Sequence, residues 1–347
     1  MKMVEESDEL IRACSDVGRF LEEDYRRAIN DSEVSSGELH NSILRRDQMQ
    51  KTWAPTRIVI VGARSVPLVT ARAVSLAGQN KCCQSIHVKC PSLDEELLVR
   101  SMWGDNQFLQ PPLSTFVFDS GGEAPQEWLD AVEDASHIVV YGSSETVEHF
   151  NLNKKPWQKV IGFGSKFSIG IAKIEGLSAR AVVDDFVQYY GSGCLSPRRY
   201  YLMGSEGQYN DFLDEMGEEY NSREDQLVRY WTKNKMPMLG VRTKNVLQSG
   251  YRDIHRSLLE EDFSDDLNGT ADVCRVDLTY RLLEGLTGTR GLISTIATNS
   301  SSLQYAHDFS SVVRFCQPGE MQSPRIMWTH DGEDELTVTS TRREMSI

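Results

Sequence analysis

The chain has 347 residues, enough for two domains, and its 39% hydrophobic and 25% charged residues are ordinary for a globular protein with a buried core. No apolar run approaches the roughly 18 residues of a membrane helix, so we expect no membrane span. With 37 basic against 51 acidic residues, the formal net charge of −14 argues against general nucleic-acid binding. A local basic pocket for a phosphorylated cofactor remains compatible with that charge.

The cysteine content indicates free thiols. Seven cysteines are an odd number, and none of them forms a CxxC pair or a zinc-finger spacing with histidine. The N-terminus, residues 1–12, is charged and helix-like and does not resemble a signal peptide. We therefore expect a reducing, cytoplasmic setting and no metal site.

The first half of the chain predicts an α/β domain. Residues 1–50 form a polar, surface-lying helical segment. Beyond it, short apolar runs that end at glycine or proline alternate with segments of helical periodicity. This alternation predicts right-handed βαβ units and a doubly wound parallel sheet. The expected strands are 57–62, 85–91, 114–122 and 136–141, and the expected helices are 66–78, 92–104, 125–135 and the segment that begins near 143.

The second half is less regular. Residues 159–174 are strand-like and broken by glycines, and 179–204 contain a helix or strand, a glycine turn and an alternating strand. Two charged amphipathic helices are expected in 206–260, an acidic loop in 261–272 and short strands in 273–315. The domains predicted are an N-terminal segment (1–50), a dinucleotide-binding domain (51–178), a second α/β catalytic domain (179–315) and a C-terminal segment (316–347).

Cys194 is the candidate nucleophile. It lies in "QYYGSGCLSPRRYYL", where glycines on both sides of Ser192 allow a sharp turn that brings peptide N–H groups near the sulfur. Arg198 and Arg199 are near enough in sequence to favour a thiolate. The alternative is a buried structural cysteine beside a glycine turn.

Two further segments are candidates for cofactor binding. Gly142 and Ser143 follow a buried strand and begin a helix, which suits a phosphate group, although a serine-capped helix with Glu145 in its first turn explains the same residues. Lys89 ends a strand at the edge where α/β folds bind ligands, and there it could pair with a ribose hydroxyl or a 2′-phosphate. The alternative is a solvated lysine.

These segments, in this order, resemble the aldehyde dehydrogenase superfamily. "VKCPSLDEELL" is similar to its cofactor strand, "VVYGSSETVEHF" to its Gly-Ser-x-Glu turn and "YYGSGCLSPRRYYL" to its nucleophile segment. Within the superfamily the resemblance is to the bioluminescence-type long-chain fatty acyl-CoA reductases, through "GSGCLSPRR", "GSKFSIGIA", "RSVPL" and the tail "GEMQSPRIMWTHDGEDEL". It covers roughly residues 50–335.

The resemblance implies NADPH-dependent reduction of a fatty acyl thioester to an aldehyde. Cys194 would accept the acyl group from acyl-CoA or an acyl-protein, Gly142 and Ser143 would lie under the cofactor, and Lys89 would pair with the adenosine ribose or its phosphate. It also implies a homo-oligomer and a partner enzyme that transfers or activates the acyl group. Two alternatives are a cysteine-dependent acyltransferase and a non-catalytic acyl-binding or scaffold protein of the same fold.

Two positions depart from the superfamily pattern. Gly162 stands where hydrolytic members carry a glutamate base, so deacylation by water should be poor. Ser65, in "RSVP", stands where the superfamily has its oxyanion asparagine, and its shorter side chain would have to supply that hydrogen bond.

Overall fold

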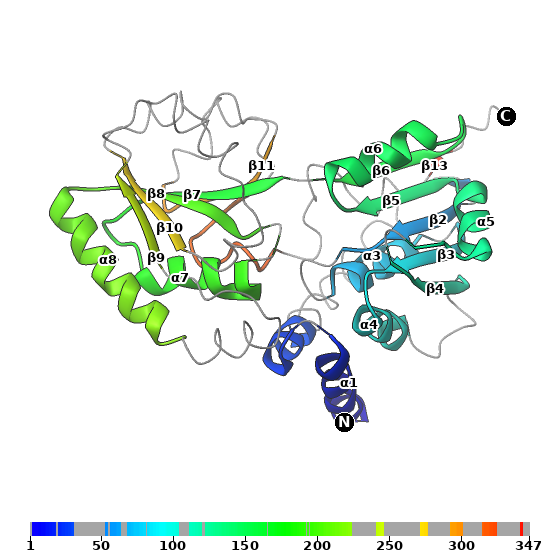
Figure 1. The fold of residues 1–347 in the computed structure, drawn as a ribbon, viewed down its shortest axis with the longest axis horizontal. Helices are drawn as coiled ribbons and strands as arrows, with labels where there is room; N and C mark the ends of the chain where they lie inside the picture. The colour runs from blue at the N-terminus through cyan, green and yellow to red at the C-terminus, as the bar shows by residue number, and fades with distance from the viewer. Residues whose placement is uncertain are drawn as a thin grey trace. The chain divides into compact units, whose positions relative to one another are not determined.

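We describe the protein from a computed structural model, and Figure 1 shows its ribbon. Its contacts divide the chain into two compact units, one of residues 1–165 with 325–347 and one of residues 166–324. The residues described are 2–18, 20–30, 53–54, 56–63, 68–80, 82–103, 111–119, 122–164, 166–191, 193, 195–223, 241–245, 271–276, 292–300, 314–324 and 341–342.

The first unit is built on a five-stranded parallel sheet. The neighbouring strands, in order, are β4 (Leu113–Val117), β3 (Cys83–Cys90), β2 (Thr56–Val61), β5 (His137–Tyr141) and β6 (Lys159–Phe163). The central strands β2 and β5 are mostly apolar because helices cover both faces of the sheet. The doubly wound sheet predicted from the sequence is confirmed.

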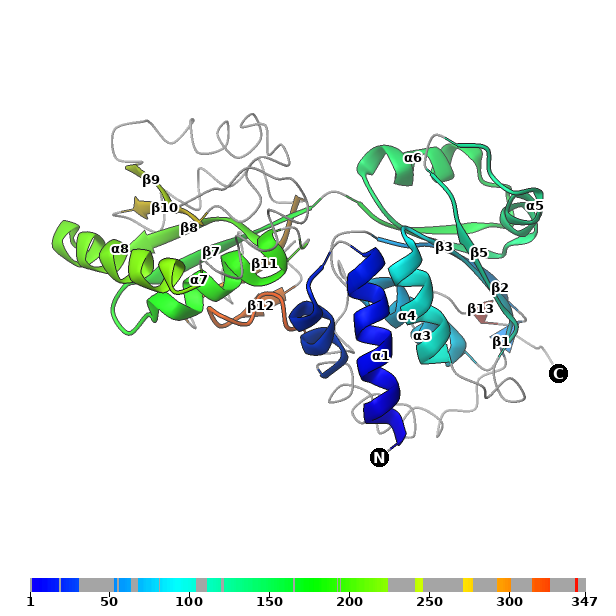
Figure 2. The ribbon, with the colours of Figure 1, turned by 60° about the horizontal axis from the view of Figure 1, so that its bottom comes forward.

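Four helices cover this sheet, two on each face (Figure 2). They are α3 (Val69–Gly78) and α4 (Leu93–Trp103) on one face, and α5 (Gln126–Asp134) and α6 (Ser144–Asn153) on the other. Trp128 of α5 is 4% exposed and packs against Val59, Val61 and Val140. Alternate strand residues thus contact opposite helix layers.

The described part of the N-terminal segment, residues 2–18 and 20–30, is largely helical, as predicted, but it is not purely a surface element. Helix α1 (Lys2–Val17) contacts α4, and residues 22–30 form a second helix. The side chains of Cys14 and Tyr25 are fully buried, and Tyr25 donates a hydrogen bond to the carboxylate of Asp94 in α4. The segment therefore contributes to the core of the first unit. Further along, β1 (Trp53–Ala54) pairs antiparallel with β13 (Thr341–Arg342), which joins the C-terminal segment to this unit.

The second unit contains a six-stranded sheet, also parallel throughout. In order, its strands are β12 (Arg314–Cys316), β11 (Ile293–Ala297), β7 (Phe167–Lys173), β8 (Pro197–Met203), β10 (Ala271–Val276) and β9 (Val241–Asn245). The domain boundary predicted at residue 178 would leave β7 in the first domain. In the structure, β7 pairs with β8 and β11, which both belong to the second unit.

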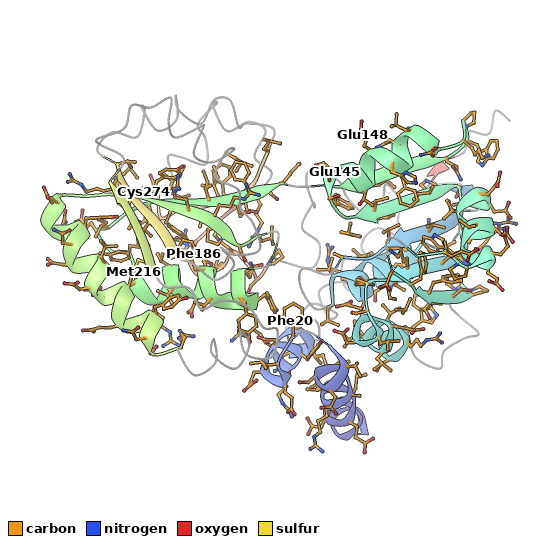
Figure 3. The ribbon with its side chains drawn as sticks, in the orientation of Figure 1. Phe20, Glu145, Glu148, Phe186, Met216 and Cys274 are labelled. Carbon is orange, nitrogen blue, oxygen red and sulfur yellow. The ribbon has the colours of Figure 1, made fainter. Side chains whose placement is uncertain are left out.

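Helices α7 (Ala179–Val187) and α8 (Glu206–Asn221) pack against each other beside this sheet. Phe186 of α7 and Met216 of α8 are buried and lie between the helices and the strands (Figure 3). Helix α8 begins in the predicted place, but residues 241–245 form strand β9 where a charged helix was expected, so that part of the prediction is wrong. Of the predicted acidic loop 261–272, residues 261–270 lie outside the described residues, and Ala271 and Asp272 already belong to β10.

No helix in the described part of the chain is long and apolar enough to cross a membrane.

Candidate active site

The strand order of the first unit reverses between β2 and β5, and ligands of doubly wound folds bind at the carboxyl end of such a switch point. Gly62 follows β2 there, and its N–H donates to the carbonyl of Lys89 at 2.9 Å. A Cβ on Gly62 would fall within 3.0 Å of the Thr70 side chain, so only glycine fits. At this edge Gly142 and Ser143 follow β5, and Lys89 lies near the end of β3, on the other side of β2.

Helix α6 begins at this edge with a serine cap. The Ser143 hydroxyl accepts a hydrogen bond from the Thr146 N–H at 3.3 Å. Hydrogen bonds from Ser143 and from the residue's own backbone N–H lower the pKa of Glu145, which lies at the start of α6 (Figure 3). The capped-helix interpretation is therefore confirmed, and phosphate binding at Gly142 and Ser143 stays a prediction.

Lys89 lies against an aromatic ring. Its Nζ is 4.7 Å from the centroid of Phe118, and that ring makes an edge contact with Trp128 at 5.8 Å. A cation held over an aromatic face gains electrostatic stabilisation. The ammonium group is thus held at the carboxyl edge of the sheet, where a ribose or its phosphate would require it.

A buried carboxyl group supports the chain beside this edge. Glu95 in α4 is 4% exposed and accepts a hydrogen bond from the Leu68 N–H at 3.2 Å. Leu68 has a left-handed φ of 69° and immediately precedes α3. Burial, and then the neighbouring Asp94, raise the pKa of Glu95 to about 8, and the Leu68 bond offsets part of this. Sequence reasoning gave no sign of this role.

We expect Glu95→Gln to change how stability depends on pH. Because the folded-state pKa of Glu95 lies above its usual 4.5, the folded protein binds this proton more tightly than the unfolded chain. The stability that this tighter proton binding gives the folded protein is fully present below about pH 4.5 and is lost as the pH rises through 8. Glutamine keeps the acceptor oxygen without a charge. The variant should therefore melt above the wild type at pH 9 and close to it at pH 5.5, as measured by calorimetry.

Glu96→Gln is the matched control on the same helix. Burial raises the pKa of Glu96, but hydrogen bonds from Thr115 and Arg100 outweigh it, and the net pKa is lowered. Its stabilising contribution is present above the usual pKa of 4.5 and disappears as the pH falls. Glu96→Gln should therefore lower the melting temperature at pH 9. Equal shifts in both variants would contradict the assignment of Glu95.

In the second unit, the chain enters the segment of Cys194 through a left-handed turn. After α7, three consecutive residues have positive φ: Tyr189 at 51°, Tyr190 at 57° and Gly191 at 69°. Each non-glycine residue in this conformation costs about 1–2 kcal/mol. Both tyrosine rings are buried, at 5% and 1% exposure, and their burial offsets that cost. Such strain is characteristic of functional turns.

A second turn contacts the same segment. Asp185 of α7 accepts hydrogen bonds from the N–H groups of Gly319 at 2.8 Å and Met321 at 2.9 Å, and from the Tyr200 hydroxyl. Burial raises the pKa of Asp185 to about 6, although these three donors and Arg314 lower it in part. The Arg314 guanidinium donates to the Met321 and Glu320 carbonyls at 2.6 Å. The turn 317–322 is thus fixed on both its N–H and C=O sides.

The predicted catalytic residues, Cys194 and Ser65, lie outside the described residues. Gly193 and Leu195, on either side of Cys194, are described, and Leu195 is 4% exposed. The prediction that Arg198 and Arg199 favour a thiolate concerns Cys194 and therefore also falls outside the described residues. Arg199 is 1% exposed, whereas the guanidinium carbon of Arg198 lies 5.0 Å from the centroid of Phe167.

Most other cysteines are unsuited to nucleophilic attack. Burial is the main cause that raises the pKa of Cys14, Cys90 and Cys316 to about 12 and that of Cys83 to about 11. Cys274 is fully buried in β10. A thiol that stays protonated is a poor nucleophile. The thiol of Cys82 is half-buried and lies in the turn before β3.

Gly162, where hydrolytic superfamily members have a base, is closed to a side chain. A Cβ built on it would lie well inside 3.0 Å of the Val147 side chain of α6. The close approach of β6 and α6 therefore favours glycine here. A carboxylate at this position would require α6 to move or Val147 to be replaced by a smaller residue.

Comparison with known proteins places this geometry in a family. The fold is similar to that of aldehyde dehydrogenase 21 from Physcomitrella patens, with a TM-score of 0.68, 10% identity and coverage of 99% of this chain and 82% of that one. It is similar to a Rhodopseudomonas palustris propionaldehyde dehydrogenase with bound propionyl-CoA (TM-score 0.59, 13% identity, 85% and 74% coverage). It is also similar to an NAD-dependent benzaldehyde dehydrogenase from Corynebacterium glutamicum (TM-score 0.63, 12% identity, 99% and 82% coverage).

These likenesses establish the aldehyde dehydrogenase fold. Comparison with curated protein sequences finds no match. The family model for Acyl-CoA reductase (LuxC), however, matches residues 5–342, nearly the whole chain. The protein therefore belongs to the LuxC acyl-CoA reductase family, whose members are oxidoreductases.

Proposed function

We propose that this protein reduces a fatty acyl thioester to an aldehyde with NADPH, through an acyl-enzyme on Cys194. The observation that carries the proposal is the strained, buried turn Tyr189–Gly191 that leads directly to Cys194, in a chain of the acyl-CoA reductase family. Strain of this kind persists where the surroundings enforce it, and here two buried rings do so. A merely structural cysteine would not require it.

In the proposed reaction, the Cys194 thiolate attacks the acyl carbonyl and coenzyme A leaves as its thiolate. Two-electron reduction of the resulting thioester by hydride gives the oxyanion of a thiohemiacetal, which collapses to the aldehyde and restores the Cys194 thiolate. Peptide N–H groups of the glycine-rich turn are suited to hold the oxyanion. The absence of a base at Gly162 protects the acyl-enzyme from water, because nothing at that position activates a nucleophilic water molecule.

The carboxyl edge of the first sheet fits a nicotinamide dinucleotide. Gly142 and Ser143 follow β5 at the switch point, where α6 begins, and the Lys89 ammonium is held by the Phe118 ring at the same edge of the sheet. When bound, such a cofactor supplies hydride. We propose that Gly142 and Ser143 support its phosphates and that Lys89 pairs with the adenosine ribose or its 2′-phosphate. A lysine suits NADPH because it offers a positive charge to that phosphate.

The acyl donor proposed is a long-chain acyl-CoA, with an acyl-protein supplied by a partner enzyme as the alternative. Intact-protein mass after mixing with acyl-CoA, with and without NADPH, tests the reaction. We expect one acyl adduct, mapped to Cys194 by peptide mass, which disappears on addition of NADPH as aldehyde forms. An adduct that persists would favour an acyltransferase, and no adduct at several chain lengths would contradict the proposal.

A further inference from the structure

Gln322 lies directly against the segment that carries Cys194. A Cβ built on Gly193 would be 2.5 Å from its Nε2 and 2.6 Å from its Oε1, so the amide group occupies the space where a side chain of residue 193 would be. The same Nε2 donates a hydrogen bond to the Ser196 hydroxyl. Both Gln322 and Ser196 are 7% exposed. One buried amide thus contacts the chain on both sides of Cys194.

The chain at this point closes on itself. The Ser196 N–H donates to the Gly193 carbonyl at 2.9 Å, a bond that joins the residues flanking Cys194 and Leu195. The amide group of Gln322 therefore braces both ends of a four-residue turn. Only glycine at 193 leaves room for this contact.

Gln322 is itself held in place. It follows Met321, whose N–H is bound by Asp185 and whose carbonyl is bound by Arg314. Met321 is fully buried. Because the backbone at Met321 is fixed, only the side-chain rotamers of Gln322 remain to be ordered when it makes this hydrogen bond. The contact with Gly193 and Ser196 is thus a rigid brace between two turns that lie far apart in the sequence.

We propose that Gln322 is a positioning residue for Cys194, which acts by fixing the turn from Gly193 to Ser196. The inference rests on the proposed function of Cys194. A nucleophile must meet the acyl carbonyl in a narrow range of geometry, and a displacement of about 1 Å can cost about 100-fold in rate. Gln322 touches no substrate in this scheme, and its effect reaches the reaction only through the turn.

Gln322→Leu tests the proposal, because leucine keeps most of the volume and removes the hydrogen bond. We expect acylation by acyl-CoA, followed by mass, to slow about 100-fold in the variant. We also expect amide exchange in the peptide around 188–197 to speed up about tenfold, because a bond that protects the turn is lost. The affinity for NADPH should stay within twofold of the wild type. Gln322→Glu retains an acceptor but no amide donor and should give the same direction of change.

Gln158→Leu is the matched control. Gln158 is a second buried glutamine, also 7% exposed, whose Nε2 donates to the Val132 carbonyl at 2.6 Å in the first unit. Its loss should speed exchange near residues 132–133 and 155–158 and leave the acylation rate unchanged. The double variant Ser196→Ala/Gln322→Leu should be acylated no more slowly than Gln322→Leu alone, because both substitutions remove the same hydrogen bond between Gln322 and Ser196.

The two readouts separate the inference from the proposed function. If the wild type forms no acyl adduct but Gln322→Leu loosens the 188–197 peptide, the reaction is wrong and the brace on the turn is real. If the wild type is acylated and the acylation rate of Gln322→Leu stays within twofold, Gln322 does not position Cys194. Unchanged exchange in that peptide would overturn the brace itself.

Discussion

Replacement of Cys194 by alanine is expected to abolish the covalent acyl adduct and to lower the rate of aldehyde formation by at least about 10⁴-fold. The covalent route needs a thiolate at this position, and burial holds the pKa of four other described thiols at about 11–12. None of these four thiols is therefore poised to replace Cys194 as the nucleophile. The measurement is NADPH oxidation under saturating acyl-CoA, with the aldehyde identified by mass.

Two controls make this result specific. Cys194→Ala should bind NADPH with an affinity within twofold of the wild type, because the proposed cofactor residues lie in the first unit. Cys82→Ala should retain full activity, because Cys82 lies in the turn before β3 and has no role in the proposed reaction. A Cys194→Ala variant that kept more than a tenth of the wild-type rate would remove the central residue of the proposed function.

The first unit could be predicted because its elements are local. The run "RIVIVG" has four consecutive apolar, β-branched residues, and it forms most of β2 at the centre of the sheet. Capping residues and glycines likewise marked the neighbouring helices. Strand β9 was not predicted because it is short. Its extended conformation is stabilised by pairing with β10, which lies further along the chain. Tertiary pairing there overrides the helical appearance of a charged segment.

The candidate site divides in the same way. Lys89 lies near the end of β3, and Gly142 and Ser143 follow β5, so their place at one edge of the sheet follows from the topology alone. Asp185 and Gln322 could not be found in this way. Asp185 binds backbone groups 134 and 136 residues further on, and Gln322 donates to a residue 126 positions earlier. A single sequence carries no signal for contacts of that length, although the segment "GEMQSPR" that contains Gln322 contributed to the family resemblance.

The buried contact between Tyr200 and Asp185 makes Gly170, in the second sheet, critical for stability. Gly170→Ala in β7 is expected to lower the free energy of unfolding by at least about 3 kcal/mol, measured from the urea midpoint. Its Cβ would lie well inside 3.0 Å of three atoms of the Tyr200 ring. That ring is fully buried, contacts Phe186 with centroids 5.6 Å apart, and is fixed by the hydrogen bond to Asp185. Tyr200 therefore has little room to move away.

Gly207→Ala in α8 is the control, because no atom lies within 4 Å of a Cβ built there. Gly207 lies in the first turn of α8 and does not have a positive φ, so alanine fits the native backbone and should raise the free energy of unfolding by about 0.4–1 kcal/mol. The same substitution thus has opposite signs at two glycines, according to the space around each. Because Tyr200 is bound to Asp185, displacement of its ring by Gly170→Ala should also loosen the turn 317–322, with faster amide exchange there than in the Gly207→Ala variant. If Gly170→Ala were as stable as the wild type, the ring would be free to shift, and Tyr200 could not be part of the support for that turn.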